Sequence, residues 1–158
     1  MLIGELLVKK GLIRQIQLDI ALDEQKKTGE FLGAVLSKLG FLKEEDLLKA
    51  LSEQFHMPYV SLRTQYVDWE LALSFSPSLV VDRRVFPFRK DNDSVTAALA
   101  NPLDVDAISQ FELEARNTGI KIVLTNTADL NQSIDAYREH LIGRAKKLFG
   151  PDLPGKST

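Results

Sequence analysis

The residue types that most often do chemistry are few and scattered in this chain of 158 residues. There is no cysteine, and the two histidines, His56 and His140, lie far apart in the sequence. Glu112 and Glu114 are two positions apart, so on a helix they point to different faces and make a poor acid–base pair. The sequence therefore favours a protein that binds over one that breaks bonds. We predict no catalytic residue, no metal site and no resident cofactor.

A different set of residues recurs at a fixed spacing of 29 positions. Between residues 3–25 and 32–54, nine of 23 aligned positions are identical without a gap. Gly4 and Gly33 begin the two copies, and Gln25 and Gln54 end them. A glycine inside a helix is explained either by tight helix packing or by a close ligand, because otherwise it costs about 1 kcal/mol against alanine. A duplicated segment is stronger evidence of common structure than any single motif.

Each copy is predicted to form two helices, because aliphatic residues recur there at helical spacing. Gly11 and Gly40 fall where the first helix of each copy must end, and we expect both to adopt a positive φ as C-caps. Arg14 and Lys43 occupy the N-cap of the second helices, where Ser, Thr or Asp would be favoured. The first 62 residues are therefore predicted to be a four-helix tandem-repeat bundle.

The remainder of the chain alternates helical and extended patterns. Ser76 and Asp104 are expected to cap helices, as is Thr127, and Pro87 indicates an edge strand because proline donates no backbone hydrogen bond. The predicted elements are helices over 69–75, 77–84, 105–117 and 127–148, and strands over 85–89, 95–99 and 120–124. We predict an α+β fold in which the bundle (1–62) and a linker at 63–67 precede a small α/β sandwich with a three-stranded sheet (68–148). A Pro/Gly-rich tail (149–158) follows.

Composition narrows the function further. The 20 basic and 22 acidic residues give a net charge of −2, which is too balanced to predict nucleic-acid binding. With 44% apolar residues the chain can bury an ordinary core, but no apolar run is long enough to span a bilayer. We expect a cytoplasmic protein that does not insert into a membrane.

The tail contains a misleading motif. Residues 150–157 fit the glycine, lysine and serine spacing of a phosphate-binding loop. A working loop follows a buried strand and opens a helix, whereas this segment follows a predicted helix and holds two prolines that lack the backbone donor. Nucleotide hydrolysis is therefore not predicted here.

Several segments, in the same order, resemble one family. Besides the repeats, they are Gln54–Leu62 (QFHMPYVSL), Arg83–Phe88 (RRVFPF), Ala100–Asp104 (ANPLD) and Asp135–Tyr137 (DAY). Over about residues 2–140 the chain is similar to the N-terminal domain of the ATPases that drive type II secretion and type IV pilus assembly. The resemblance implies a bacterial, non-catalytic docking and regulatory module at the inner membrane. Its implied partners are an inner-membrane-associated platform protein of the secretion or pilus machine and its own ATPase motor domain, in cis or in trans.

The alternative that the resemblance implies is a cyclic di-GMP sensor, since one large branch of the family binds this dinucleotide through the tandem repeats. The residues that this places at the ligand are Ile3, Gly4, Gln25, Leu32, Gly33 and Gln54. The glycines would let helix N-termini approach the phosphates, and the glutamines could read a guanine edge or order neighbouring backbone. The chain departs from the pattern at Leu2 and Phe31, where dinucleotide-binding members resemble an Arg-Leu-Gly triplet.

Overall fold

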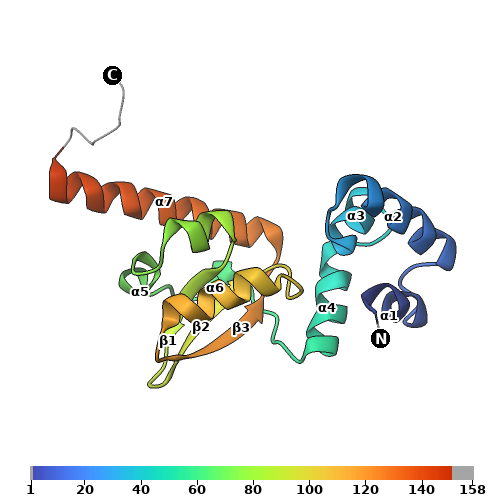
Figure 1. Cartoon of the computed structure of the whole chain (residues 1–158), viewed down its shortest axis with the longest axis horizontal. Helices are drawn as coiled ribbons and strands as arrows, with labels where there is room; N and C mark the ends of the chain where they lie inside the picture. Colours follow the sequence, from blue (N-terminus) through green and yellow to red (C-terminus); the bar gives the residue numbers. More distant parts are fainter. Residues whose placement is uncertain (1, 151–158) are drawn as a thin grey trace.

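The computed structural model describes residues 2–150, so that the tail and its phosphate-loop spacing lie outside the described residues from position 151 onward. The helices are α1 (Ile3–Lys9), α2 (Gln15–Thr28), α3 (Leu32–Lys38), α4 (Glu44–Phe55), α5 (Trp69–Leu73), α6 (Val105–Ala115) and α7 (Thr127–Phe149), with short turns η1 (Leu62–Thr64) and η2 (Ser78–Asp82), and the strands are β1 (Phe86–Lys90), β2 (Ser94–Leu99) and β3 (Gly119–Leu124). Helices α1–α4 gather at one end of an elongated molecule, and the sheet with α5–α7 forms the other end (Figure 1). The predicted α+β fold is confirmed, with the four-helix bundle preceding the three-stranded sheet.

The two repeats build the same helical hairpin with the same turn. Gly11 has φ +75° and Gly40 has φ +74°, which confirms both predicted helix ends. The N–H of Gly11 donates to Val8 O at 2.9 Å, and the N–H of Gly40 donates to the equivalent Ser37 O at 3.0 Å. Only glycine enters this left-handed region without a Cβ penalty, so the duplicated glycines set the duplicated turns.

The sheet has the order β1-β2-β3. Strands β1 and β2 are antiparallel, while β2 and β3 are parallel and are joined through α6. Pro87 lies on the edge strand β1, as its missing donor predicts, and the register shifts between Pro87 and Arg89. Helix α7 runs along the sheet half, above the strands in the view of Figure 1. Tyr137 of this helix is buried, and its hydroxyl donates to Phe75 O at 2.9 Å.

One predicted helix cap is wrong. Asp104 caps α6 as expected, accepting from the Ala107 N–H at 3.1 Å. The cap of α7, however, is Asn126, whose Oδ1 accepts from the Asp129 N–H at 2.8 Å. Thr127 is the first residue of the helix, and both its N–H and its hydroxyl donate to the carboxylate of Glu44 in α4. Asparagine is at least as favourable as threonine at an N-cap, so the preceding residue takes the cap position.

The segment after α4 joins the two ends of the molecule. The Val60 N–H donates to Leu124 O, and the Leu124 N–H donates to Pro58 O, both at 2.8 Å, so residues 58–60 run along the end of β3. The predicted linker at 63–67 instead starts within η1. Here Ser61 Oγ donates to Asp129 at 2.8 Å and Arg63 Nη2 donates to it at 3.1 Å.

Asp129 is a buried acid, since only 3% of its surface is exposed. Burial alone raises the pKa of this carboxyl, but the bonds from Ser61, Arg63 and the Asn126 side chain outweigh it and lower the pKa below the ordinary value of 3.8. The charged form is therefore favoured in the folded protein.

No described helix combines the length and the apolarity that crossing a bilayer requires.

Candidate functional site

Five of the six predicted site residues line one cavity. This first cavity has a volume of about 710 Å³ and lies mainly between the two repeats. Its walls include the predicted Ile3, Gly4, Gln25, Leu32 and Gln54, together with Leu2, Glu5, Gln15, Leu18, Leu22, Phe31, Phe55 and Leu103. Gly33 is not among them.

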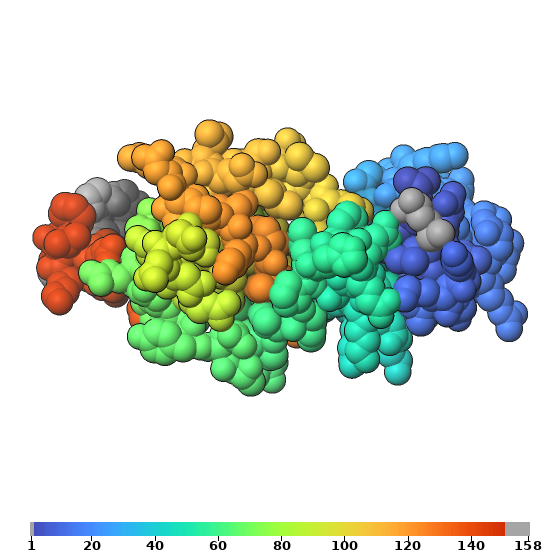
Figure 2. Space-filling model, turned by 90° about the horizontal axis from the view of Figure 1, so that it is seen from below, coloured from blue at the N-terminus to red at the C-terminus, as the bar shows by residue number. Residues whose placement is uncertain are grey.

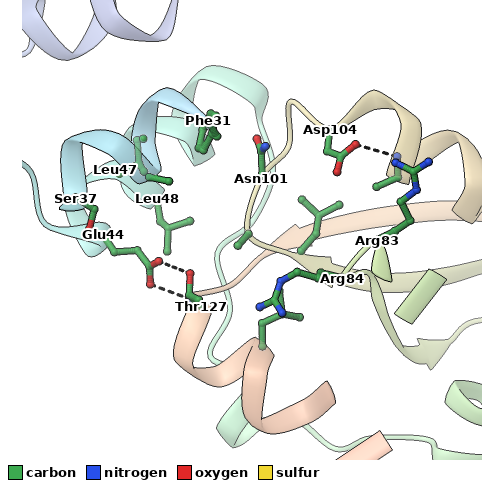
Figure 3. Close-up of a pocket in the computed structure, with 16 residues that line it drawn as sticks. Phe31, Ser37, Glu44, Leu47, Leu48, Arg83, Arg84, Asn101, Asp104 and Thr127 are labelled. Atoms are coloured by element: carbon green, nitrogen blue, oxygen red, sulfur yellow. Dashed lines mark hydrogen bonds between the residues drawn. The ribbon is translucent and has the colours of Figure 1, made fainter. Parts of the chain in front are cut away.

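Gly33 instead lines a second cavity of about 380 Å³, drawn in Figure 3. One wall belongs to the second repeat and includes Phe31, Gly33, Ala34, Glu44 and Leu47; the other belongs to the sheet half and includes Arg83, Arg84, Asn101, Asp104 and Thr127. Figure 3 shows the Glu44 carboxylate bonded to Thr127 where the walls meet.

The two cavities are related by the repeat. Seven residues between positions 31 and 48 line the second cavity, and five of them have counterparts 29 positions earlier that line the first. Phe31, Gly33, Ala34, Glu44 and Leu47 correspond to Leu2, Gly4, Glu5, Gln15 and Leu18, whereas the counterparts of Ser37 and Leu48 do not line it. Phe31 lines both cavities. The separation of Gly4 from Gly33 therefore follows from the duplication, since each glycine belongs to the cavity of its own hairpin.

Both glycines are held by helix packing. A methyl group added at Gly4 would lie 2.6 Å from Leu18 Cδ1, and one added at Gly33 would overlap Leu47 and lie 2.8 Å from Phe31 Cε1. Leu18 and Leu47 are themselves 29 positions apart. The close approach of α1 to α2 and of α3 to α4 thus accounts for a residue that otherwise weakens a helix.

Gln25 and Gln54 lie in the last turns of α2 and α4, the second helices of the two repeats. Gln25 Nε2 donates to Glu30 O at 3.0 Å, which orders the backbone between the repeats. This is one of the two roles that the sequence predicts for an amide at this position. Gln54 reaches the same cavity from α4.

The charges of the two cavities differ. Glu5 is the one formally charged side chain among the residues that line the first cavity, whose remaining walls are apolar or amide. The second cavity has Arg83 and Arg84 opposite Glu44 and Asp104. Leu2 and Phe31, which stand where the resemblance places arginines, line the cavities, so a guanidinium at either position would face a bound molecule.

The contribution of the sheet half does not follow from the sequence. Adjacency in the chain favours pairing of Arg83 and Arg84 with Asp82 on the surface, yet within residues 2–150 Asp82 makes no ion pair and Arg84 donates to Asn131. Leu103 and Phe55 of the first cavity are also absent from the predicted site. The 29-residue register could have identified the wall of the second cavity that the second repeat provides. No local pattern in the sequence indicates that Arg83 and Arg84 form part of the opposite wall.

Across residues 2–150 no group of three or more His, Cys, Asp or Glu side chains is arranged to hold a metal ion. His140 packs flat on Trp69, with ring centroids 3.9 Å apart.

Besides Asp129, Glu114 is an acid whose pKa is lowered by its surroundings. Its carboxylate accepts from the Ser76 N–H at 2.8 Å. Burial opposes ionisation of Glu114, but hydrogen bonds from Gln110 and Ser76 lower its pKa.

Comparisons of the sequence with known proteins all identify relatives among pilus assembly ATPases. The family model of the MshEN domain matches residues 55–143. The chain is 28% identical over 136 residues to the type IV pilus assembly ATPase PilB of Myxococcus xanthus, with 85% of the chain and 24% of the relative covered. It is 36% identical over 110 residues to PilB of Thermus thermophilus, with 69% and 12% covered. The chain thus spans a quarter or less of these relatives.

Solved structures give the same result. The structure of MshE with cyclic di-GMP superposes with a TM-score of 0.79 at 29% identity, covering 87% of this chain and 99% of that one. The N-terminal domain of XpsE superposes with a TM-score of 0.67 at 19% identity, covering 85% and 92%, and supports the fold alone. The family model begins only at residue 55, whereas the MshE superposition covers most of the chain.

Proposed function

The chain belongs to the MshEN domain family, the N-terminal domain of type IV pilus and type II secretion ATPases, and on this premise we propose that it is a non-catalytic docking and regulatory module of such a motor. In this proposal it binds an inner-membrane-associated platform protein from the cytoplasmic side and acts on its own ATPase motor domain. Residues 1–62 and 68–148 act as two units joined by the segment between them.

The observation that supports the docking proposal is the largely apolar lining of the first cavity. Leu2, Leu22 and Leu103 expose between 38% and 74% of their surface around it. Apolar surface in a pocket with a few amides at its edge suits an apolar anchor residue of a partner protein. With Glu5 as its charged residue, the cavity is less suited to a phosphate.

Calorimetry with the cytoplasmic part of the platform protein from the same genome tests docking. Leu103→Ser removes an apolar wall of the cavity, and we expect about tenfold weaker binding, the loss of one good apolar contact. Leu113→Ser is the matched control, because Leu113 is 77% exposed on α6 and lines neither cavity. Equal affinities of the two variants, or no binding by the unmodified chain, would contradict the proposal.

The second candidate function is cyclic di-GMP sensing, with Ile3, Gly4, Gln25, Leu32, Gly33 and Gln54 at the ligand. It is favoured by the adjoining cavities, because five residues of each are related by the 29-residue register and a dinucleotide with two like halves could place one half against each repeat. The superposition on MshE with cyclic di-GMP supports it further. In the second cavity, Arg83 and Arg84 would supply the positive charge that Phe31 lacks.

Restoring the arginines tests this candidate. A bidentate guanidinium contact is worth about 1–3 kcal/mol, so Leu2→Arg/Phe31→Arg is expected to tighten cyclic di-GMP binding roughly tenfold to a hundredfold in calorimetry. Leu113→Arg adds a cation away from both cavities and serves as the control. If high micromolar dinucleotide produces neither heat nor a shift in melting temperature with the unmodified chain, the sensor function is excluded.

A further inference from the structure

The contact between Glu44 and Thr127 joins the second repeat directly to the sheet half. Glu44 is the first residue of α4, and Thr127 is the first residue of α7. Both oxygens of the Glu44 carboxylate are used, one by the Thr127 N–H at 2.9 Å and the other by the Thr127 hydroxyl. Figure 2 shows α4 and the segment that follows it, in turquoise, between the repeats and the sheet half. The contact therefore lies where the two ends of the molecule meet.

The same contact forms part of the wall of the second cavity. Glu44 and Thr127 line this cavity together with Arg83 and Arg84 of the sheet half, and Figure 3 shows how these side chains border it. Within residues 2–150 neither arginine forms an ion pair. The cavity thus offers two cations without a carboxylate partner, while the Glu44 carboxylate is engaged by Thr127.

An anionic molecule in this cavity would compete with Glu44. The two arginines attract it, but its charge and the Glu44 carboxylate repel each other. The Thr127 N–H and hydroxyl each have one proton to donate, so they cannot serve both anions. The other acid of the cavity, Asp104, accepts from the Ala107 N–H at 3.1 Å, and this bond stays within its own helix. Displacing Glu44, in contrast, breaks a bond between the two halves.

The segment after α4 can act as a hinge when this bond is broken. Residues 58–63 stay attached to the sheet half, through backbone bonds to Leu124 at the end of β3 and through side-chain bonds to Asp129. Just before them, α4 ends on His56 in the left-handed conformation, with φ +53°. Loss of the Glu44 contact therefore releases the start of α4, while the chain beyond its end remains fixed.

We propose that the contact between Glu44 and Thr127 is a latch, which an anionic ligand in the second cavity opens. The latch rests on the second proposed function, cyclic di-GMP sensing, and supplies its regulation. A ligand that must break a contact binds more weakly than one that need not, and by linkage the ligand weakens the contact to the same extent. Glu44 thus sets the dinucleotide concentration at which the second repeat is released from α7.

Calorimetry with cyclic di-GMP and the 158-residue chain tests the effect on affinity. Glu44→Ala removes both acceptor oxygens, and Glu44→Gln keeps one of them without the charge. Glu45→Ala is the matched control, because it removes an acid from the same helical turn that pairs with Lys49 and lines neither cavity. Circular dichroism and melting temperatures check that each variant is folded.

Opening the latch in advance should tighten binding. We expect Glu44→Ala to bind the dinucleotide at least about fivefold more tightly than the unmodified chain, with Glu44→Gln in between. The affinity of Glu45→Ala should change by less than about twofold, because a distant, exposed charge is screened.

A distance measurement tests the movement. The chain has no cysteine, so Lys26→Cys on α2 and Leu113→Cys on α6 allow two spin labels to be attached at exposed positions outside both cavities. With Glu44 present and no ligand, we expect one narrow distribution of label distances. Saturating cyclic di-GMP should shift or broaden it, and so should Glu44→Ala without ligand.

The outcomes separate the latch from the sensor function. If the dinucleotide binds the unmodified chain, but Glu44→Ala binds it no more tightly than Glu45→Ala, the latch is overturned and the sensor function stands. The same holds if binding leaves the label distances unchanged. If the unmodified chain does not bind cyclic di-GMP, the sensor function and the latch fail together.

Discussion

The two repeats share an interior and differ in their surroundings. In both, a glycine of the first helix packs against a leucine of the second, Gly4 on Leu18 and Gly33 on Leu47. Outside this contact they diverge, because Glu44 of the second repeat binds Thr127 of the sheet half, while the side chain of the equivalent Gln15 donates to Asp19 of its own helix at 3.0 Å. The second repeat is thus an internal support, and the first is a free end.

This difference shows how one duplicated sequence can provide both a contact with the sheet half and an exposed apolar surface. The glycine–leucine contact inside the hairpin is the same in both repeats, whereas the exposed Ile16 and Ile20 of the first repeat correspond to the charged Glu45 and Lys49 of the second. The second repeat faces the sheet half across a cavity with charges of both signs. The first repeat presents an apolar cavity and two exposed isoleucines of α2, Ile16 and Ile20. The free repeat is therefore where we expect partners to bind.

The largest expected effect concerns the support beneath the second repeat. Asp129 holds Ser61 and Arg63, the residues that follow α4 into the sheet half. Asp129→Ala should lower the free energy of unfolding by about 2–3 kcal/mol, since it removes the hydrogen bonds that Ser61 and Arg63 donate to a buried carboxylate. Denaturant unfolding measures the loss. Asp19→Ala, at an exposed acid of the first repeat, should stay within about 0.5 kcal/mol.

The same carboxyl makes stability depend on pH. The pKa of Asp129 is lower in the folded than in the unfolded chain, so its contribution is present above the unfolded pKa of about 3.8 and is lost as pH falls through the folded value. The stability difference between the unmodified chain and Asp129→Asn should therefore shrink as pH is lowered below about 4. Glu114, whose pKa is also lowered, leaves some acid sensitivity in the variant. A pH-independent difference would contradict this assignment.

Next in size is the contact between Glu44 and Thr127. Glu44→Ala removes a carboxylate that accepts from the N–H and the hydroxyl of Thr127, and we expect a loss of about 1–2 kcal/mol because the site is partly exposed. Hydrogen exchange in the first turn of α7 should rise together with the loss. Gln15→Ala is the matched change in the first repeat and should be nearly neutral. Equal effects would mean that the second repeat is not a support.

These contacts also show where sequence reasoning succeeds. Signals that act within a few residues are sufficient for most elements: the turns at Gly11 and Gly40, the cap at Asp104 and the edge position of Pro87 are all as predicted. The predicted cap of α7 is wrong by one residue, because Asn126 is at least as favourable an N-cap as Thr127. The contact of Thr127 with Glu44, 83 positions away, follows from no local rule, since it depends on how the two halves meet.

Part of the candidate site could likewise be predicted from the sequence, and part could not. The 29-residue register locates the cavity residues of both repeats, and it explains why Gly4 and Gly33 line different cavities. It does not indicate that Leu103 completes the first cavity or that Arg83 and Arg84 face the second. Those residues come from loops and turns of the sheet half, and their placement depends on tertiary packing.

A smaller effect is expected from filling the two glycine contacts. Gly33→Ala gains helix propensity but must displace Leu47 and the ring of Phe31, so we expect a net loss of about 1 kcal/mol. Gly4→Ala meets Leu18 and, at 3.3 Å, Leu32, whose side chains border the larger first cavity and can shift into it. Its change should be near zero. Thermal unfolding of both variants provides the measurement, and a larger loss at Gly4 would reverse the expected order.

The smallest effect lies where the second helices end. Helix α2 ends on Gly29 with φ +71°, but α4 ends on His56 with φ +53°, a conformation that costs a residue with a Cβ about 1–2 kcal/mol. His56→Gly should stabilise the chain by about 0.5–1 kcal/mol, because glycine removes that penalty and returns part of the gain as unfolded-state entropy. Gly29→Ala should destabilise by a similar amount. If His56→Gly is instead destabilising, the imidazole contributes more to the junction between α4 and the sheet half than its backbone conformation costs.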